Sequence, residues 1–349
     1  MSQQTPPGVE STDPATTTTV TTTEDPPIWR KVLGSSTGRN IGLIVALALI
    51  FVTGAITAGD SFTSVNNILV ILRQASIIGV ISIGMTFVII SGGIDLSVGS
   101  VMGLASVVAT LDVMQHFVDQ THWILMVVVA IAVGIVAGII NGVVIAYGNV
   151  VAFMATLAML VAARGLAEIL AERRTLTVDS RDFIDFMNAD FLGVDILIWM
   201  FALVALAGWL VLNRTTFGRR TVAIGGNREA ARLAGINVKR HTVWLYAIAG
   251  LSAGIAAVMI LGRTTAGTST HGTLYELDAI AAVVVGGTLL IGGRGTIVGT
   301  VFGVLIFATL SNVFVQNNLS SSVQAVAKGI IIVVAVLLQQ RFAARGARE

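Results

Sequence analysis

The chain has 349 residues, of which 55% are hydrophobic and only 11% charged, and its mean hydropathy is +0.88. A globular core of this size does not need so much apolar surface, so the composition predicts a polytopic membrane protein. The net charge is only +2 and the basic residues gather at the ends of apolar stretches, which excludes a nucleic-acid-binding surface.

The first 40 residues are rich in Thr, Ser and Pro and show no hydrophobic periodicity. They cannot bury enough surface to offset the entropy of ordering, so we predict a disordered cytoplasmic tail over 1–40. A transmembrane domain is expected over 41–340, followed by a short cytoplasmic tail over 341–349. Its apolar stretches lie at about 41–58, 67–90, 97–111, 123–147, 151–171, 194–212, 242–262, 278–292, 296–314 and 322–340. The predicted fold is therefore all-α, a polytopic membrane protein with about ten transmembrane helices.

A polar segment, residues 213–241, interrupts the apolar pattern and carries seven Lys/Arg against the single acid Glu229. An excess of positive charge in a short loop marks the cytoplasmic face. We therefore expect a multi-pass protein of the plasma membrane. If the spans alternate in direction, both chain termini lie in the cytoplasm. Within the segment, Asn227 can cap a short helix that Gly235 ends. A capped helix here is a candidate docking element, although the charge count alone fits an ordinary cytoplasmic loop.

Two segments 200 residues apart resemble each other: GGIDLSVGSVMG begins at Gly92 and GGRGTIVGTVFG at Gly292. This similarity indicates an internal duplication, and the number of intervening spans predicts that the two copies run parallel. Each copy lies between short apolar halves, such as the fifteen-residue stretch 278–292. Short, Gly-interrupted segments at corresponding places in two halves point to a transport pathway. Gly92, Gly93, Asp95, Ser97, Gly99, Gly292, Gly293 and Gly299 are therefore the candidate pathway residues.

Asp95 stands out because a carboxylate inside a bilayer costs about 2.5–3.5 kcal/mol even on the lenient insertion scale. It is either a functional group or a cap for the helix that begins near Leu96, and the two readings are compatible. Uncharged polar residues in the spans suit a solute such as a sugar, or they hydrogen-bond between helices. The candidate substrate-lining residues are Ser82, Thr86, Asn141 and Asn312.

Charged residues within or bordering the other spans have simpler explanations. Arg164 and Glu168 lie four residues apart on one helix and are expected to pair, whereas Arg73 and Lys328 are near span ends and can snorkel. Glycines spaced four apart, such as Gly134 and its neighbours, predict close helix packing within one chain rather than a dimer face.

Several chemistries find no support. Cysteine is absent, which excludes disulfides and thiolate metal sites, and the four histidines show no ligand spacing, so no metal or cofactor is assigned. There is no G-x-x-x-x-G-K-[ST] phosphate loop, no G-x-S-x-G elbow and no H-E-x-x-H. The chain is therefore not expected to be an enzyme, and any ATP hydrolysis belongs to a partner.

Three long segments carry a resemblance to a known family: 72–104, 225–240 and 275–305, with a looser match over 141–166. In these the chain resembles the permease subunits of ATP-binding-cassette (ABC) sugar importers of the ribose/xylose/galactose type. The resemblance implies a monosaccharide importer that works by alternating access. Its implied partners are a cytoplasmic ABC ATPase, an extracytoplasmic solute-binding protein and a second permease subunit, as in a homodimer.

The resemblance also gives the docking element a sharper meaning. The segment EAARLAG resembles the EAA coupling segment that docks on the ATPase in ABC importers. Asn227, Glu229, Ala230, Ala231 and Gly235 are the coupling residues that it implies. Two other hypotheses remain at this stage: an ion-coupled secondary sugar transporter, which leaves this segment unexplained, and a purely structural membrane protein, which has no use for Asp95.

Overall fold

A computed structural model of the chain describes residues 36–346, and the side chains of 36–40, 332, 335, 336 and 338–346 fall outside that description. The chain divides into two units, Met1–Arg39 and Asn40–Glu349. Of the predicted N-terminal tail, only the last five residues are described, and they begin a helix. The segment predicted as a C-terminal tail is helical as far as Gly346.

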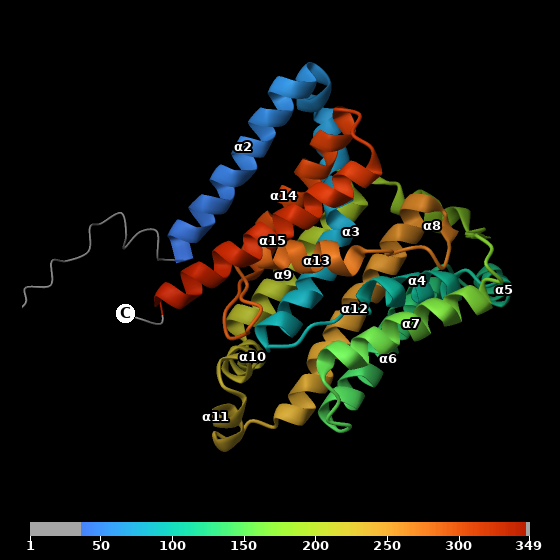
Figure 1. Cartoon of the computed structure of the whole chain (residues 1–349). Helices are drawn as coiled ribbons and strands as arrows, with labels where there is room; N and C mark the ends of the chain where they lie inside the picture. The colour runs from blue at the N-terminus through green and yellow to red at the C-terminus, as the bar shows by residue number, and fades with distance from the viewer. Residues whose placement is uncertain (1–35, 347–349) are drawn as a thin grey trace, which may run out of the picture. The chain divides into compact units, whose positions relative to one another are not determined.

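The described elements are helices and a few two-residue strands (Figure 1). In chain order they are α2 (Ser36–Thr63), α3 (Val65–Ile90), α4 (Val98–Ala109), α5 (Asp112–Gln120), α6 (Ile124–Ala146), α7 (Ala152–Leu170), β1 (Leu176–Thr177), α8 (Arg181–Met187), β2 (Asp190–Phe191), β3 (Val194–Asp195), α9 (Ile196–Arg214), α10 (Thr216–Gly226), α11 (Arg228–Leu233), α12 (Val238–Thr264), β4 (Ala266–Gly267), α13 (Tyr275–Val285), α14 (Ile297–Gln316) and α15 (Ser321–Gly346). β1 pairs with β4 and β2 with β3, both antiparallel. The all-α membrane fold is confirmed.

The predicted number of about ten spans is not confirmed. Among the described residues, seven helices are long and apolar enough to cross a membrane, or eight if α4 and α5, which are bent by 57°, form one span. The predicted stretch 278–292 forms only the 11-residue α13, because a glycine-rich turn follows it. The stretch 322–340 lies in α15, whose second half is described only in part.

The centre of the bundle is built on α12 and α3. Of the most apolar 18-residue window of each helix, 83% is buried in α12 and 61% in α3, against 6% in α2. A helix that is apolar all round and buried belongs to a core, whereas exposed apolar side chains on α2 suit contact with lipid. Ser64 lies between α2 and α3. Its hydroxyl accepts a hydrogen bond from the backbone N–H of Asn67 and so caps α3.

Glycines line the most extensive helix contact, which lies between α6 and α12 (Figure 1). A Cβ on Gly134 would lie 2.2 Å from the carbonyl oxygen of Gly250, and one on Gly138 would lie 2.2 Å from that of Tyr246. The two backbones therefore touch, and no larger residue fits between them. The prediction that these glycines pack within one chain is confirmed.

The two ends of the bundle differ. We call the end that carries α10 and α11 the α11 end, and the opposite end, which carries α8, the α8 end. α14 runs antiparallel to α3, because Thr86 bonds Thr300 while Asn67, at the other end of α3, bonds Asn312. α12 is also antiparallel to α3, since Gly84 lies beside Ser252 and Gly93 beside Tyr246. α4 runs parallel to α12, because its end at Thr110 meets Gly267, just after the end of α12. The two glycine-rich copies therefore run parallel, as predicted.

Candidate functional site

The first glycine-rich copy breaks the helix between α3 and α4. Gly92 has φ +82°, a conformation that favours glycine, and the backbone stays non-helical until Val98. Asp95 is buried in this break, and its Oδ1 accepts hydrogen bonds from the Ser97 backbone N–H at 2.8 Å and from the Ser97 hydroxyl at 2.6 Å. Asn141 on α6 donates to the same hydroxyl at 2.8 Å. The carboxylate thus holds Ser97, the residue before α4, but no described side chain caps α4, so the predicted cap is wrong, and the helix begins two residues beyond the predicted position.

The second copy has the same local plan. Gly292 has φ +89° and Gly293 has φ +77°, and α14 begins at Ile297, in register with α4 to within one residue. Here Thr296 caps α14, since its hydroxyl oxygen accepts a hydrogen bond from the Gly299 N–H at 3.0 Å. The internal duplication inferred from the sequence therefore has a counterpart in the backbone. The difference is that a hydroxyl caps the helix in the second copy, whereas in the first a buried carboxylate holds the residue that precedes the helix.

The two copies meet at the α11 end, and the polar segment 213–241 joins them there. The Gly293 N–H donates to the Ile90 carbonyl oxygen at 2.8 Å. A Cβ on Gly225, in the last turn of α10, would lie 1.8 Å from that same oxygen and 2.5 Å from the Gly293 nitrogen. A Cβ on Gly292 would lie 2.9 Å from the Gly92 nitrogen. We call the meeting point of Gly92, Gly225, Gly292 and Gly293 the glycine node.

Next to the glycine node lies α11, the predicted coupling helix. Asn227 caps it, with Oδ1 accepting the Ala230 N–H at 2.9 Å, and Gly235 ends it with φ +83°. Ala231 is buried beside Ile224 and Val238, which fastens the helix to α10 and α12. The opposite face of α11 is exposed. Both predicted ends of this helix are confirmed, while a docking role for it remains a prediction.

One ion pair lies on the exposed face of α11. Glu229 Oε1 lies 2.6 Å from Arg232 Nη2, one turn along the helix. Hydrogen bonds from the Arg232 guanidinium hold the pKa of the Glu229 carboxyl below its usual value. Because both side chains are exposed, the pair stabilises the helix only slightly. Its carboxylate is therefore ionised and available to a partner.

A cavity of about 430 Å³ opens beside the glycine node. It is lined in part by Gly92 and Gly93, by Arg228 of α11 and by Tyr246 of α12. The Tyr246 hydroxyl donates to the Ile94 carbonyl oxygen at 3.4 Å, so α12 also supports the first copy. The sequence reasoning missed Tyr246, because one aromatic residue in an apolar helix is indistinguishable from a core residue by pattern.

The predicted substrate-lining residues are all buried within this one chain. Thr86 bonds Thr300 at 2.7 Å, Asn141 bonds Ser97, and Asn312 bonds Asn67. Ser82 donates back to the Ile78 carbonyl in its own helix. For Thr86, Asn141 and Asn312 this arrangement favours the second reading given above, in which these residues hydrogen-bond between helices, whereas Ser82 bonds only within its own helix.

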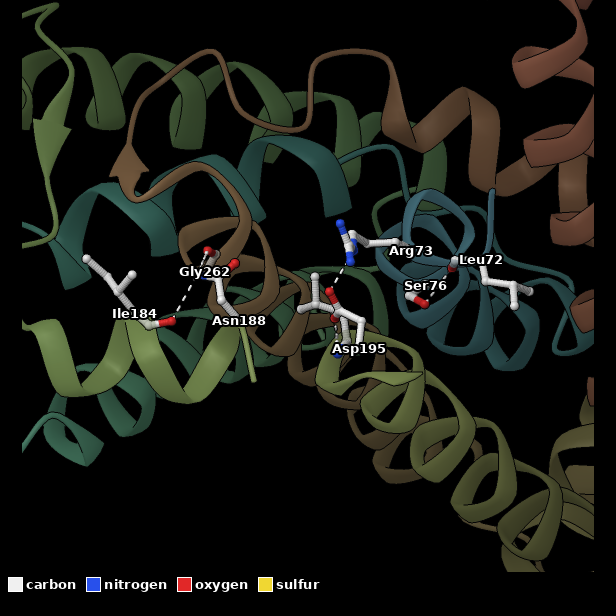
Figure 2. A network of polar contacts seen from close by, with 8 residues as sticks. Leu72, Arg73, Ser76, Ile184, Asn188, Asp195 and Gly262 are labelled. Atoms are coloured by element: carbon white, nitrogen blue, oxygen red, sulfur yellow. Dashed lines mark hydrogen bonds and ion pairs between the residues drawn. The ribbon is translucent and has the colours of Figure 1, made fainter. Parts of the chain in front are cut away.

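Three charged residues have partners that the sequence did not predict. The Nε of Arg73 lies 2.6 Å from Oδ2 of the buried Asp195, which also caps α9 by accepting a hydrogen bond from the Leu197 N–H at 2.7 Å (Figure 2). Lys328 likewise pairs with Asp278, at 3.1 Å.

The third residue is Arg164, and its expected pair with Glu168 is wrong. Arg164 instead donates to the carbonyl oxygens of Ser269 and His271, and Glu168 pairs with Arg173 at 3.4 Å. In all three cases the partner is distant in sequence or lies beyond the helix end. Spacing along one helix cannot reveal such a partner.

Comparison with known proteins identifies the relatives of this chain. The family described as "Branched-chain amino acid transport system / permease component" matches residues 67–337. The chain is 41% identical to the ribose import permease protein RbsC of Bacillus subtilis over 306 residues, which is 87% of this chain and 92% of the relative. It is 39% identical to RbsC of Haemophilus influenzae over 301 residues, 85% and 90% of the two chains.

A third relative widens the range of sugars. The L-arabinose transport system permease protein AraH of Escherichia coli is 35% identical over 303 residues, 86% of this chain and 90% of the relative. No solved structure matches the chain.

Proposed function

The chain belongs to the permease family of the branched-chain amino acid transport system, and we propose that it is the membrane-spanning subunit of an ABC importer for a monosaccharide. The observation that carries the choice of solute is the similarity to ribose and arabinose permeases over at least 85% of the chain. A pentose is therefore the substrate to test first. No observation favours an ion-coupled transporter.

The proposed complex pairs this chain with a second copy, a separate ATPase subunit and a solute-binding protein. The positive charge of residues 213–241 supports a cytoplasmic position for the α11 end, where in this proposal α11 meets the ATPase. The exposed carboxylate of Glu229 and the exposed residue Ala230 form the contact, while the buried Ala231 and the caps Asn227 and Gly235 hold the helix in place.

The mechanism we propose passes motion through the glycine node. Movement of α11 shifts Gly225, which touches both Ile90 and Gly293. The non-helical turns at Gly92 and Gly292 can absorb a change in φ and ψ without breaking helix hydrogen bonds. In this proposal the two turns form the cytoplasmic end of the pathway. The helices that follow the turns, α4 and α14, continue the pathway from there, and their first residues are set by Asp95, Ser97, Gly99 and Gly299.

Uptake assays test the proposed function. Cells with and without this chain receive labelled ribose, arabinose, xylose and galactose, with vanadate or a protonophore added in parallel. Loss of vanadate-sensitive uptake of one sugar upon removal of the chain supports the importer. Uptake that ignores vanadate and collapses with the proton gradient would instead indicate a secondary carrier.

The coupling role needs its own test. Glu229→Lys is expected to leave the chain folded and the ATPase active but to lower sugar uptake at least tenfold. The reason is that the substitution reverses the charge that α11 presents to the ATPase. Arg240→Glu is the matched control: it changes an exposed charge in the same segment but outside α11. Full uptake in the Glu229→Lys variant would refute the docking role of α11.

A further inference from the structure

The segment 268–274, which joins β4 to α13, lies deeper in the bundle than an ordinary surface loop. α13 packs antiparallel to α14, with Gly286 beside Gly299 and Ala282 beside Gly303. At this register Tyr275, the first residue of α13, lies level with residue 310 of α14, which continues for six more residues. Six residues of helix span about 9 Å. The segment before α13 therefore begins at the α8 end and reaches about 9 Å below it.

Contacts with α4 also place the segment inside the bundle. A Cβ on Gly267 would touch the Thr110 hydroxyl, at 2.0 Å, at the α8 end of α4. A Cβ on Gly103 would lie 2.8 Å from the His271 carbonyl oxygen, and one on Gly99 would lie 2.2 Å from that of Gly272. The segment thus descends along α4 from its last residue almost to its first.

Irregular backbone at this depth has two permitted environments. In hydrocarbon no water satisfies free backbone groups, so non-helical chain occurs only where protein buries it or where it lines a water-filled cavity. One side of the segment is buried. Arg164 donates to the carbonyl oxygens of Ser269 and His271, at 2.8 Å for the latter, and the Ser106 hydroxyl contacts His271 Nδ1 at 3.2 Å.

The other side of the segment is open. Thr270 and Thr273 are both exposed, and so is Leu274, at 56%. The Thr270 hydroxyl lies 3.2 Å from that of Thr268, and the Thr273 hydroxyl donates to the Thr270 carbonyl oxygen at 2.7 Å. These bonds leave acceptor lone pairs on the exposed hydroxyls that lipid cannot satisfy, so water suits this side better than lipid.

We propose that the segment 268–274 lines the water-filled sugar pathway and that Thr270 and Thr273 contact the sugar as it passes. This inference rests on the proposed function and adds a solute-contact site to it. A threonine hydroxyl both donates and accepts, which matches a sugar hydroxyl, and its methyl group can meet a sugar C–H face. Arg164, held on the buried side, positions the segment and does not itself touch the sugar.

The absence of cysteine from the chain makes a direct test available. Thr270→Cys and Thr273→Cys place single thiols on the open side, and Leu274→Cys gives a third reporter if either threonine variant is poorly produced. Val161→Cys is the control: it lies on α7, one turn from Arg164, and is 64% exposed among apolar neighbours. The chain is purified with its partner subunits and reconstituted in nanodiscs, where both faces are open to a charged methanethiosulfonate reagent.

We expect the cysteines at 270 and 273 to react at least tenfold faster than the cysteine at 161, because only a hydrated thiol ionises and meets a charged reagent. Saturating ribose should slow their reaction severalfold and leave Val161→Cys unchanged. Reaction no faster than that of the control would overturn the proposal. Fast reaction without protection by ribose, arabinose, xylose or galactose would keep the aqueous lining and remove the sugar contact.

A kinetic readout separates this inference from the proposed function. Thr270→Val and Thr273→Val are expected to raise the KM for uptake severalfold with little change in maximal rate, and Thr→Ser at the same positions should restore it. Unchanged KM in both valine variants, with normal sugar uptake, would refute the contact and leave the importer intact. If none of the tested sugars is taken up by the parent chain, the proposed function is refuted instead. The labelling result would still decide whether the segment faces water.

Discussion

The backbone N–H of Gly293 donates a hydrogen bond to the carbonyl oxygen of Ile90, at 2.8 Å, and so the second glycine-rich copy completes the end of the helix that leads into the first. The last carbonyl groups of a helix have no partner within it. Here the partner comes from the other copy, and Gly225 packs against the same oxygen. A change at any one of these three residues therefore acts on both copies.

Gly225→Ala is expected to disrupt the glycine node. Its new methyl group would lie 1.8 Å from the Ile90 oxygen, so the backbone must move, at a cost of about 1–3 kcal/mol. We predict lower abundance in the membrane and loss of most sugar uptake. Gly226→Ala is the matched control, since a Cβ there has no atom within 4 Å. Equal uptake in the two variants would contradict a role for the node.

Asp95 is predicted to act by fixing the turn rather than through its charge. Oδ1 alone accepts both hydrogen bonds from Ser97, and an asparagine amide offers the same oxygen. Asp95→Asn should keep near-normal abundance and uptake, whereas Asp95→Ala leaves buried donors unpaired and costs about 1–3 kcal/mol. Thermal denaturation in detergent and uptake measure the two effects. Normal abundance without uptake in Asp95→Asn would show that transport needs the carboxylate charge.

The ion pair of Asp278 with Lys328 is predicted to fasten α15 to α13. The side chains are only 18% and 24% exposed, so removal of one partner leaves a poorly solvated charge. Asp278→Asn or Lys328→Met alone should destabilise the chain by about 3–5 kcal/mol, and the double change Asp278→Leu/Lys328→Met by much less. Thermal denaturation of the singles and the double forms the test. Additive losses would contradict direct coupling between the two residues.

The Glu229–Arg232 pair predicts a pH profile. Since the pKa of Glu229 in the fold lies below its ordinary value of 4.5, its contribution to α11 is fully present above that pH and is lost only as the pH falls further. The ratio of sugar imported to ATP hydrolysed should therefore be constant from about pH 6 to pH 8. Glu229→Gln, which lacks the titration, serves as the comparison. A ratio that falls within this window in the parent but not in Glu229→Gln would contradict the assignment.

The sequence predicted those features whose causes are local. Apolar stretches place most helix ends within a few residues, and Asn227 and Gly235 bound α11 through cap chemistry. The glycine repeat predicts two broken segments, at Gly92 and Gly292, and both glycines have a positive φ. Each of these follows from a residue and its neighbours within one or two turns.

Features that depend on distant partners could not be predicted in this way. The sequence shows Arg73 as a charge near a span end, and only the fold brings Asp195 to it. Similarly, 263–277 has the composition of an ordinary outer loop. It descends into the bundle because Gly99 and Gly103 leave room for its backbone on α4. Hydropathy measures neither the pairing of Arg73 with Asp195 nor the packing of this loop on α4. It also overestimates the length of α13, because it does not show that the chain turns at the glycines after Val285.

The position of α3 at the centre of the bundle has a consequence for how the chain is made. α3 is among the first helices to leave the ribosome, yet Asn67 and Thr86 find their partners on α14, and Asn312 follows Asn67 by 245 residues. At synthesis rates of about 5–20 residues per second, roughly 12–50 s pass before Asn67 can meet Asn312, and until then its side chain has only its local bond to the Phe62 carbonyl oxygen. During that interval it needs a temporary neighbour within the insertion machinery, so a chain truncated before α14 should be held there or degraded.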